Sequence, residues 1–379
     1  MDAEITTQKE PADREVDNTI LSSRALYKHD PLLVLLKDKL HLGTVWIVVG
    51  GFVLVGFISF IFFPIAISGF HPFVSLGDAF DLLLFTLAIT LSLLINLLLP
   101  ASIASVFNTL QANGAIGPSR QERLGAMSYA RFLEHLIAWV DSRWWSITIV
   151  MFSLLYFLYT IFINNRQSLT LPPLLLLVNF ILVFLPEIYL NSFAGLRVVL
   201  LLIFVNRLFF LFSIRVRPLH ADGSGGLAAL SQMWWMGAAL MFTDALLIFA
   251  VVGHLSARLS PLEIIGITIA YPTTIIALAI GWLALPHHVM LQARNEHLQP
   301  LTEEYERVLM ETRPAPDEET AQIVAGTERL SALKQRYELV RGTFPTWPLQ
   351  IVEMRGLAVA LLLPALISLL PALFNLFMK

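Results

Sequence analysis

The chain contains seven long stretches without a charged residue, and they restrict its fold more than any other feature. The stretches cover residues 40–77, 82–119, 144–165, 167–186, 223–243, 264–293 and 356–378. A helix needs about 20 apolar residues to cross the ~30 Å hydrocarbon core of a bilayer. Backbone polar groups in lipid must be hydrogen-bonded within the protein, so we expect these stretches to form transmembrane helices.

The composition agrees with a membrane protein. Hydrophobic residues make up 56% of the 379 residues and charged residues 14%, whereas about 25% of residues are charged in soluble domains. The chain has no cysteine, which excludes thiol catalysis, cysteine-zinc sites and disulfides. A net charge of −3 argues against nucleic-acid binding. We therefore predict an all-α polytopic membrane helix bundle with seven or eight transmembrane helices.

The number of spans depends on the segment 192–217, which is apolar but carries Arg197, Arg207, Arg215 and Arg217. If it crosses the membrane, there are eight spans. If it re-enters or lies in the interface, there are seven, and every charged block is cytosolic. Because basic loops favour the cytosol and a mid-membrane arginine is costly, we prefer seven spans with the N-terminus inside and the C-terminus outside. They are 45–69, 79–108, 144–164, 172–190, 233–255, 263–286 and 350–377.

The charged residues divide the chain into domains, since 40 of the 53 lie in the blocks 1–44, 120–143 and 289–356. We expect a multi-pass membrane protein with four parts. These are a cytosolic N-terminal segment 1–44, a transmembrane bundle 45–286, a cytosolic helical hairpin 287–349 and a final transmembrane helix 350–379. The bundle includes a helix at 121–142, which lies on the inner membrane surface or caps the bundle, and a glycine-rich loop at 218–228.

The hairpin is predicted from apolar residues at a/d-like spacing on two arms. The first arm carries Leu291, Leu298, Leu301, Tyr305 and Val308, and the second Ile323, Leu330, Leu333, Tyr337, Val340 and Phe344. The first arm is expected to continue from the 263–286 span. The two arms pack against each other, or several copies form an oligomeric bundle; the sequence leaves both readings open.

Asp244 and four further residues, Thr243, Arg207, Glu187 and Tyr271, are candidates for a pore or substrate pathway. Asp244 lies mid-span after Thr243, and an intramembrane carboxylate is either functional or paired with a cation; Arg207 is the partner we expect first. Glu187 follows Pro186, and it either joins Asp244 and Arg207 in a polar pocket or lies at the membrane surface. Tyr271 begins a Tyr-Pro-Thr-Thr sequence that is expected to interrupt its span and either line a cavity or only kink the helix.

His220 and Asp222 are the candidate ligands of the glycine-rich loop. They could bind a metal or a phosphate group, with glycine allowing close backbone approach; alternatively, Asp222 orders a turn before a helix. The sequence from Arg217 to Leu227 resembles the H-P-D-x-x-G-G-L loop of uncharacterised bacterial multi-spanning inner-membrane proteins, with Ala221 in place of the proline. The resemblance implies a bacterial inner-membrane setting and no particular activity.

Three functions remain open. The first is a homo-oligomeric channel or transporter-like conduit for ions or small solutes; insect-chemoreceptor-type channels have a similar arrangement of a span that continues into a cytosolic helix. The second is a membrane enzyme that acts at the lipid interface through His220 and Asp222, although a non-enzymatic role is preferred. The third is a sensor or scaffold that recruits a cytosolic protein through 287–349. The expected partners are the lipid bilayer and further copies of the chain, without nucleic acid. No cofactor and no metal can be named from the sequence.

Overall fold

The computed structural model describes residues 20–62, 76–119, 127–166, 177–178, 180–217, 220–255, 261–312, 320–344, 356 and 359. Most of these residues are helical. The elements in chain order are η1 (Ser23–Leu26), α1 (Pro31–Leu33), η2 (Val34–Lys39), α2 (Thr44–Phe57), η3 (Ile58–Phe62), α4 (Leu76–Ala112), β1 (Ile116–Ser119), α5 (Tyr129–Val140), α6 (Arg143–Arg166), η5 (Phe180–Phe184), α8 (Leu185–Leu211), β2 (Phe212–Ile214), α9 (Leu230–Leu255), α10 (Pro261–Glu311) and α11 (Thr320–Thr343). The elements η2, η3 and η5 are short π-helical segments.

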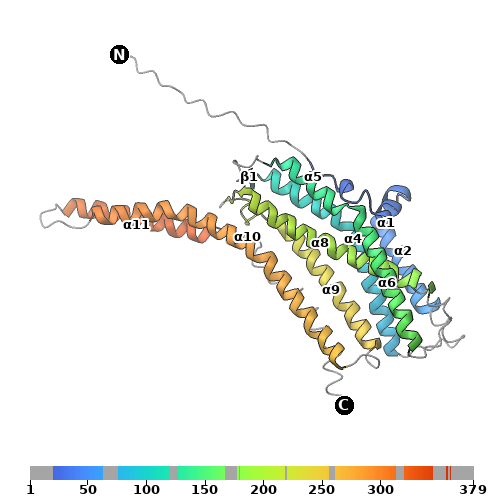
Figure 1. Ribbon diagram of the computed structural model, residues 1–379. Coiled ribbons are helices and arrows are strands. Elements are labelled where there is room, and N and C mark those ends of the chain that lie inside the picture. The colour runs from blue at the N-terminus through green and yellow to red at the C-terminus, as the bar shows by residue number, and fades with distance from the viewer. Residues whose placement is uncertain are drawn as a thin grey trace.

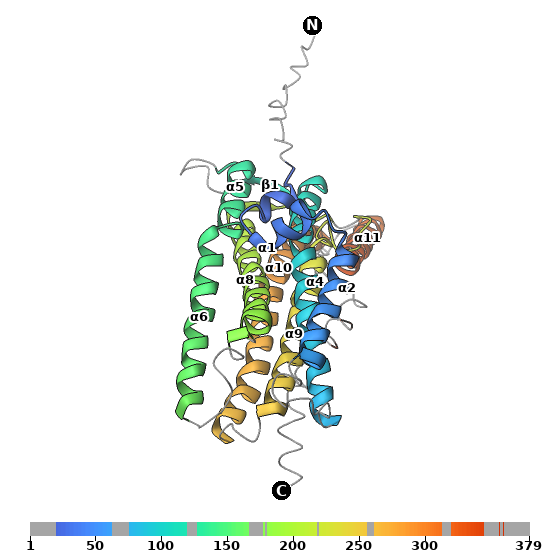
Figure 2. The same cartoon turned by 90° about the vertical axis from the view of Figure 1, so that its right-hand side faces the viewer.

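The long helices form a bundle with one elaborated end. Helices α2, α4, α6, α8, α9 and α10 run side by side (Figure 2). The short elements α1, α5 and β1 gather at one end, and α11 lies at the same end (Figure 2). Helix α10 forms one outer side of the bundle and leaves it at this end, where it forms a hairpin with α11 that leans away from the other helices (Figure 1).

Among the described residues, three helices are long and apolar enough to cross a membrane. They cover Leu82–Ala112, Phe180–Leu211 and Leu230–Phe249, and a shorter apolar helix covers Thr44–Phe60. The predicted helical membrane protein is therefore confirmed in its helical character. Leu82–Ala112 and Leu230–Phe249 overlap most of the predicted spans 79–108 and 233–255, whereas Phe180–Leu211 shares only residues 180–190 with the predicted span 172–190. The predicted final span, 350–377, lies outside the described residues apart from 356 and 359.

The segment 192–217 differs from both readings of the sequence. Helix α8 begins at Leu185 and continues without interruption to Leu211, so most of the segment extends the predicted span 172–190. It is neither a separate crossing nor a re-entrant loop. The predicted interruption at Tyr271 is also wrong, because α10 is one continuous helix of 51 residues through this point. Neighbouring groups can compensate for the hydrogen bond that a proline removes from a membrane helix.

A small antiparallel sheet is the one departure from the predicted all-α fold within the described residues. Strand β1 pairs with β2, with Ile116 opposite Ile214. A Cβ atom at Gly117 would lie 2.9 Å from the carbonyl oxygen of Ser213, so the close approach of the strands requires glycine at this position. The sheet joins the turn after α4 to the end of α8.

The largest buried cluster lies at the elaborated end of the bundle. Helix α5 supplies Phe132, whose ring centroid lies 5.7 Å from that of Phe204 on α8 and 6.0 Å from that of Phe107 on α4. The Ser128 hydroxyl caps α5 by accepting a hydrogen bond from Arg131 N at 3.3 Å. Helix α5 therefore covers this end of the bundle with its apolar face.

The hairpin of α10 and α11 has an apolar seam. Leu298, Leu301 and Val308 of α10 are buried, as is Leu333 of α11. Phe344, directly after α11, belongs to the main buried cluster of the bundle. The two arms therefore pack against each other, and the base of the hairpin is anchored on the bundle.

Candidate functional site

Residues 20–43, which we call the N-terminal strap, lie across the elaborated end of the bundle. The strap is fixed at its start by Asn108 of α4, which accepts a hydrogen bond from Leu21 N at 2.8 Å and donates one to Leu21 O at 3.0 Å. Near its end, Lys37 Nζ donates to the carbonyl oxygen of Leu97 at 2.7 Å. Side chains of α4 and of the strap itself thus hold the strap at both ends.

Asp30 occupies the middle of the strap, where it caps a helix and pairs with a cation. Its Oδ1 accepts hydrogen bonds from the backbone N–H groups of Leu32 at 3.1 Å and Leu33 at 3.2 Å. The Tyr189 hydroxyl of α8 donates to the same oxygen at 3.1 Å. The other oxygen, Oδ2, lies 3.0 Å from Nη2 of Arg197. Local capping therefore orients the carboxylate toward α8.

Arg197 is completely buried, and Asp30 is 2% exposed. The guanidinium group lies 4.3 Å from the centroid of the Phe193 ring, and Nη2 also donates to Leu26 O at 3.4 Å. Among the described residues, Nε and Nη1 have no hydrogen-bond partner. Because an unpaired buried charge is strongly destabilising, the strap supplies the counter-charge that α8 needs.

A second acid–base pair joins the strap to the end of α5. The Asp141 carboxylate accepts a hydrogen bond from His29 N at 2.8 Å and lies 2.7 Å from His29 Nδ1. Asp141 is buried, whereas His29 remains partly exposed. The strap therefore contacts α4, α5 and α8 through polar groups, and it closes the end of the bundle over Arg197.

Two polar contacts join α4 to α8 below this cluster. Asn96 Nδ2 donates to the carbonyl oxygen of Leu190 at 2.6 Å. Ser92 Oγ donates to Asn191 Oδ1 at 2.6 Å. Interhelical hydrogen bonds of this kind stabilise helix pairs in membranes.

The structure does not bring the predicted pathway residues together. Glu187 and Arg207 are twenty positions apart on one continuous helix, which places them about 30 Å apart. Arg207 is exposed. In the described part of the chain neither Glu187 nor Asp244 has an ion-pair partner, so the expected pairing of Asp244 with Arg207 is not formed.

The remaining facts about the pathway candidates concern Glu187, Thr243 and Tyr271 individually. Oε2 of Glu187 is buried without a hydrogen-bond partner among the described residues. Thr243 is buried, and its hydroxyl donates to the carbonyl oxygen of Ala239 at 2.9 Å, one turn earlier in α9. The side chain of Tyr271 lies outside the described residues.

The glycine-rich loop is a turn ordered by Asp222. Its carboxylate accepts hydrogen bonds from the backbone N–H groups of Ser224, Gly226 and Ala228 at 2.9, 3.0 and 3.2 Å. His220 Nδ1 lies 2.9 Å from the same carboxylate. Partial burial by itself raises the pKa of Asp222, but these hydrogen bonds together outweigh burial and hold the pKa below its usual value.

The geometry of the loop supports the second interpretation of its sequence, in which Asp222 orders a turn before a helix. Gly226 has a φ of +93°, a conformation that favours glycine. The carboxylate oxygens of Asp222 are occupied by backbone donors, as in the alternative that we described from the sequence. No group of three or more histidine, aspartate or glutamate residues that could hold a metal ion occurs among the described residues.

The sequence indicated that an arginine in the apolar helix α8 is energetically costly, but it did not indicate that Asp30 is the residue that pairs with Arg197. Arg197 stands alone between Glu187 and Arg207, and an isolated cation in an apolar helix predicts a nearby acid. From the sequence alone, several acidic residues could equally well be the partner of Arg197. Asp30 is followed by Pro31, a pair of residues typical of a helix start. The sequence therefore indicates that Asp30 caps a short helix, but it does not indicate that the capping carboxylate faces Arg197.

No protein-family model, no curated protein and no solved structure matches the chain.

Proposed function

We propose that the chain is a homo-oligomeric membrane conduit for ions or small solutes, and that its hairpin assembles the subunits. The observation that carries this proposal is α10, a single helix of 51 residues that runs along the bundle and continues into the hairpin (Figure 1). A continuous helix transmits displacement along its axis. Contacts made by the hairpin outside the membrane therefore act directly on the part of α10 inside it.

Seven crossings with a cytosolic N-terminus fit this arrangement. The strap, α5 and α11 all lie at one end of the bundle (Figure 2), and each belongs to one of the three blocks that together contain 40 of the 53 charged residues. Because α8 carries the segment 192–211 onward in the same direction, no eighth crossing is needed to place the charged blocks on one side. Basic residues favour the cytosolic side, so we assign the elaborated end to the cytosol.

The outer surface of the hairpin supports self-association. Met310 is 78% exposed, and Leu309 and Val324 are also exposed, although the seam between the two arms is filled by other side chains. Large apolar side chains exposed on both arms of the hairpin are typical of an interaction surface. We infer that they pack against the hairpins of neighbouring subunits.

A path between subunits fits the bundle better than a path through it. The described interior of the elaborated end is a packed apolar cluster. By contrast, Gly266, Thr273 and Gly281 are exposed on α10, and an added Cβ at either glycine would meet no atom within 4 Å. Gly266 and Thr273 are seven residues apart and share one face of the helix. Small residues allow close helix approach in membranes.

The test combines oligomeric state with flux. Purified protein is sized by light scattering in detergent and then reconstituted in liposomes for ion-flux measurement. We expect an oligomer that permits flux, and we expect Met310→Glu to reduce both. The matched control is Ser331→Glu, which adds the same charge at an exposed polar position of α11. A monomeric wild-type protein in tight liposomes contradicts the proposal.

A scaffold role is the second candidate, because the same exposed side chains of the hairpin fit a cytosolic protein. Flux measurements on liposomes that contain the purified chain distinguish a scaffold from a conduit. A scaffold predicts tight liposomes and a stoichiometric complex between the full chain and one partner, which Met310→Glu dissociates. A conduit predicts flux from the purified chain alone.

A further inference from the structure

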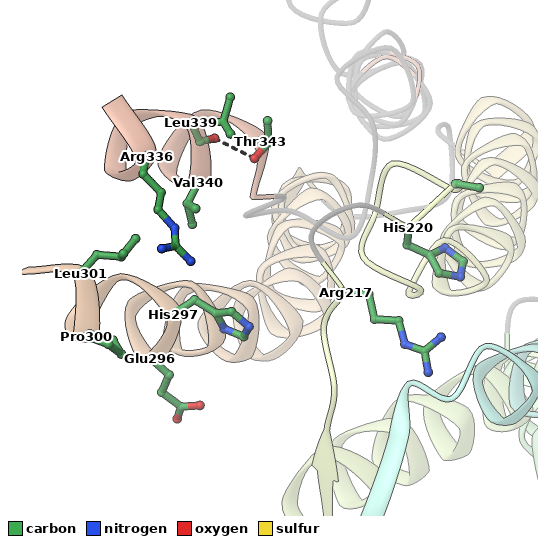
Figure 3. Close-up of a pocket in the computed structure, with 11 residues that line it drawn as sticks. Arg217, His220, Glu296, His297, Pro300, Leu301, Arg336, Leu339, Val340 and Thr343 are labelled. Carbon is green, nitrogen blue, oxygen red and sulfur yellow. Dashed lines mark hydrogen bonds between the residues drawn. The ribbon is translucent and has the colours of Figure 1, made fainter. Parts of the chain in front are cut away.

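A cavity of about 1090 Å³ lies where the hairpin leaves the bundle, and we call it the elbow cavity. Its walls come from three parts of the chain. Arg217 and His220 belong to the loop before α9, His297 and Leu301 to α10, and Arg336 and Val340 to α11. Figure 3 shows the hairpin residues on one side of the space and the loop residues on the other. The cavity therefore bridges the bundle and the hairpin.

The charged and titratable groups around the elbow cavity are mostly basic. Arg217, Arg336, His220 and His297 line it, against one acid, Glu296. In Figure 3 the guanidinium group of Arg336 points toward the space between the two hairpin arms, whereas the Glu296 side chain points away from it. The arrangement favours an anionic occupant.

No acid among the described residues neutralises the two arginines. Within the part of the chain that the structure describes, neither Arg217 nor Arg336 forms an ion pair. By contrast, Arg329 on the same helix, α11, pairs with Glu304 of α10 at 3.3 Å. Ion pairs between the two arms of the hairpin therefore form where an acid faces an arginine. The Arg217 guanidinium group points away from the hairpin in Figure 3, and its Nη2 lies beside Gly114, so its side chain must turn toward the cavity to share a ligand with Arg336.

His297 is held in a fixed orientation beside them. Its Nδ1 hydrogen-bonds to the carbonyl oxygen of Ala293 at 2.9 Å, and its ring centroid lies 5.4 Å from that of Phe344. These contacts leave Nε2 for a further partner. His220, across the cavity, already pairs with Asp222 through Nδ1, so its contribution is weaker.

We propose that the elbow cavity binds a phosphate-bearing ligand. The planar guanidinium group of arginine recognises phosphate oxygens through paired hydrogen bonds, and two unpaired arginines from separate elements fit a ligand with two anionic groups. Leu301, Leu339 and Val340 add an apolar wall suited to the organic part of such a molecule. The volume is comparable to that of sites for small organic ligands, about 300–1,000 Å³.

The ligand would act as a bridge between the hairpin and the bundle. One anionic group bound by Arg336 and another bound by Arg217 would favour one angle between α11 and the loop before α9. A ligand that binds one conformation more tightly shifts the population toward it. This site is independent of the oligomeric conduit, since it lies within one chain.

The experiment uses the full chain in phosphatidylcholine nanodiscs and titrates it with pyrophosphate and ATP by calorimetry. A second arm replaces a fraction of the lipid with phosphatidic acid and measures whether the lipid co-purifies with the protein. Binding in the first arm identifies a soluble phosphate compound, and binding only in the second identifies a phospholipid headgroup. Either result supports the proposal, and the absence of binding in both arms overturns it.

Variants then locate the site. Arg336→Gln and Arg217→Gln are each expected to weaken binding by about tenfold or more, since each removes a charge-assisted contact, and Arg336→Lys is expected to retain part of the affinity. The matched control is Lys334→Gln on the same helix, which removes an exposed cation outside the elbow cavity. If all of these variants bind like the control, the ligand lies elsewhere and the proposal fails. The result is separable from the conduit proposal because neither flux nor oligomeric state enters the measurement.

Discussion

The carboxylate of Asp30 and the guanidinium group of Arg197 lie 3.0 Å apart at the end of the bundle, and both are buried. One residue belongs to the N-terminal strap and the other to the middle of α8. Capping of α1 orients the acid, and the Phe193 ring covers the base. The position of the strap is therefore coupled to the charge balance of the bundle.

The first prediction concerns this ion pair. Arg197→Met leaves the carboxylate of Asp30 buried without its cation, and Asp30→Asn leaves the guanidinium without its anion. Each change is expected to lower the free energy of unfolding by about 3–5 kcal/mol, because one buried charge stays uncompensated. The double variant is expected to lose less than the sum of the two, since no unpaired charge remains. Thermal unfolding in detergent, followed by tryptophan fluorescence, measures these differences.

The control for the ion pair is Arg207→Met, on the same helix but exposed. Its effect is expected to stay within about 0.5 kcal/mol. Equal losses for Arg197→Met and Arg207→Met would show that the buried pair does not stabilise the fold.

The second prediction concerns the start of the strap. Asn108→Ala removes both hydrogen bonds to the backbone of Leu21 and is expected to loosen residues 20–26 at a cost of about 1–2 kcal/mol. Hydrogen exchange of this segment is expected to accelerate. The matched control is Asn113→Ala, which removes a hydrogen bond to Gly226 instead. Faster exchange at residues 20–26 in the control as well would refute a specific role for Asn108.

The third prediction concerns the pH dependence of the glycine-rich loop. The pKa of Asp222 is lowered in the folded state from its usual value of 3.8, so the ionised carboxylate stabilises the fold. This contribution is fully present above pH 3.8 and is lost as the pH falls through the lower folded-state pKa. Wild-type protein is therefore expected to be more stable than Asp222→Asn at pH 7, and the difference is expected to shrink toward pH 3. A difference in unfolding midpoint that does not change between pH 7 and pH 3 would rule out this linkage.

The fourth prediction concerns the small sheet. Gly117→Ala places a Cβ 2.9 Å from a backbone oxygen of Ser213, so we expect a loss of about 1–3 kcal/mol as the strands separate. Gly195→Ala is the control, because its Cβ would meet nothing within 4 Å. Within α8 this second change is expected to be neutral or to stabilise by up to about 1 kcal/mol. Comparable thermal midpoints for the two variants would contradict the close approach of β1 and β2.

The helices could be predicted from the sequence because uncharged apolar runs have few alternatives in lipid. The end of the helix that overlaps the fourth uncharged stretch, 167–186, could not be predicted. We separated the segment 192–217 because its arginines are costly in lipid, whereas the structure continues α8 through it and covers Arg197 with the strap. Local hydrophobicity does not specify which distant segment packs over a helix, so Asp30 could not be chosen from the sequence.

The candidate site was predictable only where the interactions are local. The turn ordered by Asp222 uses backbone groups within six residues, and the glycine pattern indicated it as one of two readings. The pocket of Glu187, Arg207 and Asp244 required contacts between helices, and two of its members are separated along one helix. The functional role of Asp244 stays a prediction. The elbow cavity combines residues from three elements, which no spacing along the chain reveals.

The ion pair between the strap and α8 also imposes an order of assembly. During synthesis the segment that contains Asp30 leaves the ribosome first, and its partner appears only after several helices have been made. The strap therefore has no completed surface to bind until α8 is in place. Its docking is a late event in biogenesis, and protection of residues 20–43 from protease would report that α4, α5 and α8 have reached their final arrangement.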